Sequence, residues 1–301
     1  EGVRTWLDTG LSGGASNDVK VRLKGNLNDF PFPESKGGGL FQVTARVTDG
    51  VLEYANGWPR MENMDGDLTF RGRRMDILLR DASILGAKLA PVHAEIPDLY
   101  KPDRVLSING EAEGATTEFL NFIARSPVLD AIDRFTENMR AEGRGKLALK
   151  LAIPLAGPRD TKFTGTFQLQ NNRIEVEDLF FPAEQATGRL EFSETGVRVP
   201  GVTMSILGGP ATLTGATQRD GTLRLLLAGR VNMDNFRPAT GALLAQAMRG
   251  STDWKTTFVV HKRLADIVFE SALQGIVSDL PAPLAKSASE SMPLRVERQV
   301  V

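Results

Sequence analysis

The chain has 301 residues, with 36 Lys and Arg against 37 Asp and Glu, and it has no cysteine. A net charge of −1 argues against nucleic acid as a partner, because binding to a phosphate backbone requires a positive field. The lack of cysteine excludes disulfides, thiol nucleophiles, iron–sulfur clusters and thiolate zinc sites. With 41% hydrophobic and 24% charged residues, the composition is typical of a folded protein with a sizeable core.

Apolar and polar residues alternate through most of the chain, which is the pattern of strands with one apolar face. The clearest alternating runs are residues 19–23, 41–47, 147–153, 163–169, 174–176, 223–227 and 258–260. Turn-type dipeptides at 49–50, 65–66, 109–110, 142–143 and 220–221 lie between or beside such runs, and they predict hairpin connections. We therefore expect a mainly β protein built from repeated antiparallel meanders.

Two segments have helical periodicity instead. Residues 116–139 carry an apolar stripe that includes Phe119 and Phe122, with Thr116 or Thr117 as caps and a break at Pro127, so they predict a helix pair. Residues 235–248 form a second amphipathic segment, which we expect to end at Gly250. Both are predicted to be short amphipathic α-helices that pack on the sheet.

An internal repeat is the strongest signal in the sequence. At an offset of 122 residues, seven of the 21 positions from 66 to 86 are identical, and the tetrapeptide Ser-Ile-Leu-Gly at 83–86 recurs at 205–208. In each copy this tetrapeptide leads to a further strand and then to a helical segment. The predicted units are a first meander plus helix over 1–142, a second over 143–250, and a partial third repeat with a Pro-rich tail over 251–301.

Several sequence segments, in this order along the chain, resemble the AsmA-like family of bacterial envelope proteins. They are residues 25–32, 54–59 ending in Trp-Pro, 66–70, 122–127, 145–155 closing in Ile-Pro-Leu, and 278–284. The resemblance implies a long, strongly curved β-sheet groove that shelters phospholipid acyl chains. It also implies a periplasmic section of a Gram-negative protein that is anchored in the inner membrane by a helix outside this chain.

The same resemblance implies transport of phospholipid between the inner and outer membranes by binding alone. Acyl chains and neighbouring repeats of a longer chain are then the expected partners, and membrane contacts are expected only outside this section. The lining residues are expected among the aligned alternating positions of the two copies. These candidates are Phe41, Val43, Leu52, Tyr54, Leu68 and Phe70, with Phe167, Leu169, Ile174, Val176, Leu190 and Phe192.

Other functions remain open at this point. The same apolar positions could fill a closed β-sandwich array, which would be a structural scaffold of the cell envelope or a glycan-binding module. Carboxylate pairs such as Glu62 with Asp65, or Glu175 with Glu177, could in principle serve a hydrolase. With only His93 and His261 in the chain, we expect no metal site, no cofactor and no enzymatic activity.

Overall fold

The computed structural model describes residues 10–32, 38–132, 134–157, 160–177, 181–261 and 264–298. Within these residues the chain forms sixteen strands and a few short helices. It divides into two compact units, one of residues 1–128 and 146–166 and the other of residues 129–145 and 167–301.

The first unit contains the first six strands and one α-helix. Its elements are β1 (Leu11–Lys24), η1 (Leu27–Asp29), β2 (Leu40–Leu52), β3 (Met61–Arg71), β4 (Arg74–Ile84), β5 (Ala87–Ile96), β6 (Val105–Ala115) and α2 (Thr116–Ala124). Helix α3 (Val128–Ala131) and strands β7 (Met139–Pro154) and β8 (Lys162–Val176) have residues in both units.

The second unit contains the remaining strands. Its elements are β9 (Ala183–Ser193), β10 (Gly196–Ile206), β11 (Gly209–Thr217), β12 (Leu223–Asn232), α4 (Met233–Thr240), η4 (Leu243–Ala247), β13 (Met248–His261), β14 (Leu264–Ser271), β15 (Ile276–Ser278) and β16 (Leu294–Arg298).

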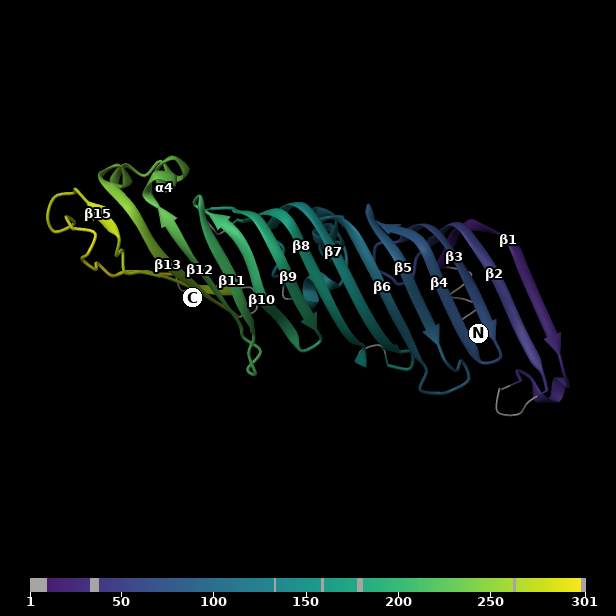
Figure 1. The fold of residues 1–301 in the computed structure, drawn as a ribbon. Coiled ribbons are helices and arrows are strands. Elements are labelled where there is room, and N and C mark those ends of the chain that lie inside the picture. Colours follow the sequence, from purple (N-terminus) through teal and green to yellow (C-terminus); the bar gives the residue numbers. More distant parts are fainter. Residues whose placement is uncertain are drawn as a thin grey trace. The chain divides into compact units, whose positions relative to one another are not determined.

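The strands form antiparallel meanders, because hydrogen-bonded neighbours follow one another in the sequence from β1 to β14 (Figure 1). Strand β16 then pairs with β14, and the short β15 pairs with β13. This order confirms the mainly β, antiparallel meander fold predicted from the alternation. All the segments named as alternating runs lie in strands.

The repeated Ser-Ile-Leu-Gly segment makes the same two-residue hairpin turn in each unit. Both central residues have positive φ, Leu85 at 49° and Gly86 at 95° in one turn, Leu207 at 55° and Gly208 at 71° in the other. Positive φ at both positions defines the type I′ turn, whose twist matches that of paired strands. The tetrapeptide therefore recurs because it closes the β4–β5 and β10–β11 hairpins.

Residues with positive φ, in bulges and in the hairpin turn, recur at the same spacing as the sequence repeat. Asp49, Asn63 and Leu85 have positive φ, and so do Asn171, Gln185 and Leu207, each 122 residues further on. The strand register shifts beside Asp49, Asn63 and Gln185, as expected where an extra residue interrupts a ladder. The two halves of the chain thus share backbone irregularities as well as sequence.

Four of the five predicted turns are wrong for the same reason. The dipeptides at 49–50, 65–66, 109–110 and 142–143 lie inside β2, β3, β6 and β7, and only 220–221 connects two strands. A glycine inside a strand marks a bulge or a close backbone approach, not a chain reversal. Gly66 shows this, because a Cβ there would lie 2.5 Å from the Leu78 carbonyl oxygen.

The helical segments form as predicted but are shorter. Residues 116–139 give α2 and α3 around Pro127, yet Thr116 and Thr117 lie inside α2, and Glu118 accepts a hydrogen bond from the Ala115 amide at its start. The second segment breaks at Gly241, whose left-handed conformation ends α4, and Gly250 lies in β13. The expected helix end at Gly250 is therefore wrong.

Helices α2 and α4 each begin beside the Ser-Ile-Leu-Gly hairpin turn of their own unit. A Cβ on Gly86 would lie 2.6 Å from Glu118 Oε1 of α2, and a Cβ on Gly208 would lie 2.7 Å from Asn235 Cβ of α4. The Asn235 amide also donates to the Gly208 carbonyl oxygen at 2.9 Å. Glycine at the second turn position thus lets the helix approach the turn in both units.

Candidate functional site

One face of the first unit's sheet is apolar from strand to strand. Side chains of directly paired residues project from the same face of a sheet, so the register assigns the faces. The pairs Val21–Val43, Val43–Phe70, Phe70–Met75 and Met75–Ile96 run across five strands without a polar residue. A parallel row, Ala45–Leu68–Ile77–Ala94–Ile108, lies beside it.

The opposite face of the same strands carries the charges. Arg46 bonds Asp67 at 3.3 Å, Arg80 bonds Asp65 at 2.6 Å, and Arg80 also reaches Asp67. The two guanidinium groups hold the pKa of Asp67 below its usual value, chiefly through the hydrogen bond from Arg80. These half-exposed ion pairs identify the face that meets water.

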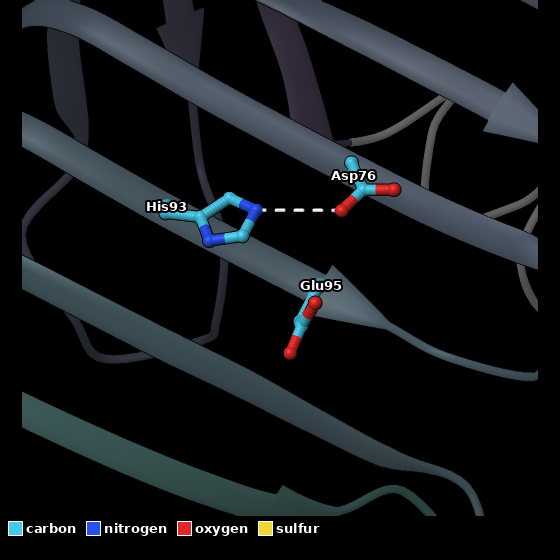
Figure 2. A group of neighbouring side chains, drawn as sticks. All are labelled: Asp76, His93 and Glu95. Carbon is cyan, nitrogen blue, oxygen red and sulfur yellow. Dashed lines mark hydrogen bonds and ion pairs between the residues drawn. The ribbon is translucent and has the colours of Figure 1, made fainter.

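Asp76, His93 and Glu95 form the one group of metal-ligand type found among the described residues (Figure 2). His93 Nε2 lies 3.3 Å from Asp76 Oδ1, but Arg74 donates to Asp76 at 2.7 Å and also bonds Glu95. Arg74 lowers the pKa of Asp76 more than His93 does. Because a guanidinium already serves both carboxylates, the group fits an ion-pair network better than a metal site.

Three of the four candidate hydrolase carboxylates are engaged in ion pairs. Glu62 pairs with Arg60, and Asp65 pairs with Arg80. Glu175 pairs with Arg173, which lies two residues earlier in the same strand, β8. The side chain of His261 lies outside the described residues. Among the described residues, the ion pairing of these three carboxylates fits a charged sheet face better than a general acid and base.

The second unit repeats the division into two faces. Its apolar face follows the pairs Phe192–Val197, Val202–Leu213, Leu213–Leu227, Leu225–Phe258 and Phe258–Ile267. The opposite face carries Arg198 bonded to Glu191 at 3.1 Å, and Glu270 bonded to Lys255 at 3.0 Å and Arg295 at 2.8 Å. Both units therefore have one apolar face and one charged face.

The apolar faces are covered over part of their area. In the first unit, Met64, Leu79, Ala82 and Val92 are buried near the strand ends that lead to α2. In the second unit, Met233 of α4 and Ile276 of β15 pack with Trp254 in a buried cluster. By contrast, β1 leaves Val19, Val21 and Leu23 between 56% and 65% exposed.

Most candidate lining residues lie on these apolar faces. Phe41, Val43, Leu68 and Phe70 share a face by register, and Leu52 packs against the same buried cluster. Phe167, Leu169, Ile174 and Leu190 pack in one cluster of the second unit, and Phe192 pairs with Val197 on that face. Val176 follows Ile174 with strand alternation in β8.

Tyr54 lies beyond the end of β2, outside the strand face. Its ring is 6.2 Å from that of Trp58, which in turn is 5.8 Å from Phe122 of α2. Burial raises the pKa of Tyr54 to about 12. Tyr54 therefore belongs to the contact between the β2–β3 loop and α2.

Some residues of the apolar faces were absent from the candidate set. They include Val19, Val21, Leu23, Met75, Ile77, Leu225, Leu227 and Phe258. Most lie in alternating runs that predict strands, but alternation within one strand carries no information on the register that connects them with the repeated positions. Trp254, packed over Gly229, carried no such alternation signal of its own.

These features define a class: an antiparallel β-meander protein whose sheet is apolar on one face and charged on the other. The family model described as "YhdP protein" matches residues 1–300, and the chain belongs to that family. It is similar to the intermembrane phospholipid transporter YhdP of Escherichia coli strain K12, with 24% identity over 97% of this chain. The chain spans 23% of the length of that relative. No solved structure matched.

Among the described residues, no helix has the length and apolar character needed to cross a membrane.

Proposed function

We propose that this chain is a section of a periplasmic conduit that shelters phospholipid acyl chains on the apolar face of its sheet. In this role the acyl chains of the phospholipid move along a continuous, curved β-groove between the inner and outer membranes. The proposal includes no catalytic residue, cofactor or chemical step. The observation that carries it is the separation of apolar and charged side chains onto opposite faces in both units.

The energetics explain why a continuous apolar face would suffice. Exposing roughly 30 methylenes of one phospholipid to water costs about 24 kcal/mol, at about 0.8 kcal/mol for each methylene. A sheet that covers the chains at every step removes this barrier without doing chemistry. The half-buried side chains at Phe41, Val43, Leu68 and Phe70 offer such cover in the first unit.

The scaffold alternative predicts that protein covers the apolar faces completely. The high exposure of Val19, Val21 and Leu23 on β1 favours the lipid role, because soluble proteins rarely leave contiguous apolar surface open without a binding partner. The membership in a family with a phospholipid-transporting relative favours the same reading.

The test is native mass spectrometry with lipid extraction, applied to residues 1–301 produced in a Gram-negative host. Leu68→Gln places an amide on the apolar face, and Leu78→Gln makes the same change on the charged face, where Leu78 is 44% exposed. We expect co-purified phospholipid to fall in the first variant and to persist in the second.

Leu225→Gln and Leu226→Gln form the equivalent pair in the second unit, since adjacent residues of β12 point to opposite faces. Val21→Asp adds a variant at a position exposed enough to tolerate a charge without unfolding. Equal lipid content in every folded variant, or a wild-type chain that takes up no phospholipid from labelled vesicles, would refute the proposal and leave the scaffold function.

A further inference from the structure

The chain between β14 and β16 lies beside the first residues of β13 (Figure 1). Strand β14 pairs with residues 255–261 of β13 and ends at Ser271. Strand β15 then pairs with residues 248–250, at the other end of β13, before the chain returns to form β16 against β14. We call residues 272–293 the strap, because they fill the place beside β13 that β14 leaves open.

The strap places few side chains in the protein interior. All of its residues are described, and only Ile276, Ser278 and Lys286 are buried. Ile276 is 2% exposed and packs in the cluster that contains Trp254 and Met233. A segment with so few buried apolar contacts opens at a lower free energy than the strands around it.

Hydrogen bonds within the strap hold it together. Lys286 Nζ donates to the carbonyl oxygens of Leu273 at 2.9 Å and Ser287 at 3.0 Å, and also to that of Ile276. All three acceptors belong to the strap itself. Because these bonds do not reach the sheet, the strap keeps them when it moves as one piece.

The strap is joined to β13 through a short stretch of chain. The links among the described residues include the three residue pairs of β15 and the Asp279 amide, which donates to the Ala247 carbonyl oxygen at 2.9 Å. Asp279 also forms an ion pair with Arg249 at 2.6 Å, but both side chains are more than half exposed, so this pair adds little stability. Opening of the strap leaves the ladder between β12 and β13 intact.

Two buried polar groups at the contact between the strap and the cluster have no hydrogen-bond partner among the described residues. They are Trp254 Nε1 and Ser278 Oγ. Trp254 is 7% and Ser278 5% exposed, so neither group is paired with bulk water. A buried donor without an acceptor destabilises the conformation that contains it. An acceptor that reached Trp254 would remove this penalty.

The surroundings of Trp254 define the ligand that would supply the acceptor. The cluster consists of apolar side chains, and the Trp254 ring stacks on that of Phe269 with 6.1 Å between the ring centres. An indole N–H only donates, so the ligand must carry an acceptor next to a long apolar part. A free carboxylate would bury an unpaired charge there, which is costly. The carbonyl oxygen of a fatty acyl ester meets both conditions.

From this geometry we infer that the cluster around Trp254 is a binding site for the acyl ester of a phospholipid, and that Ile276 fills part of it while the strap is closed. When the strap opens, an acyl chain replaces Ile276, and its ester carbonyl accepts the hydrogen bond from Trp254 Nε1. The inference rests on the proposed function and adds to it a hydrogen-bond donor and a cover in the second unit.

A disulfide that holds the strap closed tests the site. Arg249 and Val277 are directly paired, and such residues have Cα atoms about 4.5–5.5 Å apart, within the range that a disulfide spans. The chain has no cysteine of its own, so Arg249→Cys with Val277→Cys gives a single disulfide on oxidation. The matched control, Arg224→Cys with Val259→Cys, joins β12 to β13 at an equally paired position away from the strap.

The readout is quenching of Trp254 fluorescence by phosphatidylcholine with brominated acyl chains, in a background where Trp6 and Trp58 are replaced by phenylalanine. Oxidation should lower the quenching about tenfold in the strap variant, because it removes the binding-competent state, and should leave the control unchanged. Equal quenching of the oxidised and reduced strap variant, or an equal loss in the control, would overturn the role of the strap as a cover.

The hydrogen bond from Trp254 is tested with two phosphatidylcholines, one with ester-linked and one with ether-linked chains. The ether lipid lacks the carbonyl oxygen, so wild type should bind the ester lipid about fivefold more tightly. Trp254→Phe should abolish this preference, and Trp58→Phe, which removes an indole from the first unit, should keep it. No preference in wild type, or an equal preference in Trp254→Phe, would refute the role of the indole. If Trp254→Phe does not fold, the oxidised strap variant replaces it, because a closed strap should abolish the preference as well.

The two proposals fail in different ways. A wild-type chain that carries no phospholipid and takes none up refutes the sheltering of acyl chains, and the Trp254 site with it. A chain whose phospholipid is lost in Leu68→Gln, while brominated lipid leaves Trp254 unquenched in the Trp6 and Trp58 background, retains the apolar face of the first unit and loses only the Trp254 site.

Discussion

Leu226 and Leu227 provide a direct test of the two-faced sheet. They are adjacent in β12, yet Leu227 is 8% exposed within the cluster around Trp254, and Leu226 is 41% exposed on the charged face. Substituting each with alanine removes the same atoms and changes the intrinsic strand propensity equally. Any difference in stability therefore reports burial.

The expected magnitudes follow from that burial. Losing three buried carbon groups costs about 2.4 kcal/mol, and the cavity left behind raises the cost of Leu227→Ala to about 3 kcal/mol. Leu226→Ala should cost about 1 kcal/mol or less, because much of the side chain already meets water. We expect the two variants to differ by about 2 kcal/mol.

Urea unfolding followed by the fluorescence of Trp254 measures this difference, in a background where Trp6 and Trp58 are replaced by phenylalanine. Trp254 reports the relevant region because it packs in the same cluster as Leu227. Equal unfolding midpoints for the two variants, at unchanged denaturant dependence, would show that the assignment of faces in the second unit is wrong.

Three further predictions follow from local features. Leu85→Val should lower stability by about 1 kcal/mol and Leu85→Asn should not, because a β-branched residue is strained at the φ of 49° found there; thermal unfolding of both variants measures this. The pKa of Asp67 is lowered in the folded state, so its ion pairs stabilise the fold above the unfolded pKa near 3.8 and are lost as the pH falls through the lower folded value. Since the pair is half exposed, its contribution to the free energy of unfolding should stay below about 1 kcal/mol. The melting temperature of Asp67→Asn should fall less steeply than that of wild type as the pH is lowered from 5 to 2, and an equally steep fall would contradict the assignment. Lys286 is buried and donates to the carbonyl oxygens of Leu273 at 2.9 Å and Ser287 at 3.0 Å, so Lys286→Met should speed hydrogen exchange of the β15 amides at least tenfold while β12 keeps its protection.

The sequence alone was sufficient to identify the mainly β, antiparallel fold class, six of the sixteen strands through their alternating runs, and the internal repeat. Alternation with period 2 is a local property of the chain, and the identical tetrapeptides at 83–86 and 205–208 mark equivalent turns without any structure. The helices were recognisable by their apolar stripes, but Gly241 and not Gly250 ended the second one, because the left-handed conformation that stops a helix depends on the fold.

The tertiary structure decided which side chains share a face. Phe167 and Leu169 have odd numbers and Ile174 has an even number, yet all three pack in one cluster, because the chain has positive φ at Asn171 between them. A bulge adds one residue to one strand and so reverses the alternation beyond it. The dipeptides found at such bulges also occur at hairpin turns. Only the pairing of whole strands distinguishes a bulge from a turn, and this pairing therefore decides which face of the sheet is apolar and which is charged.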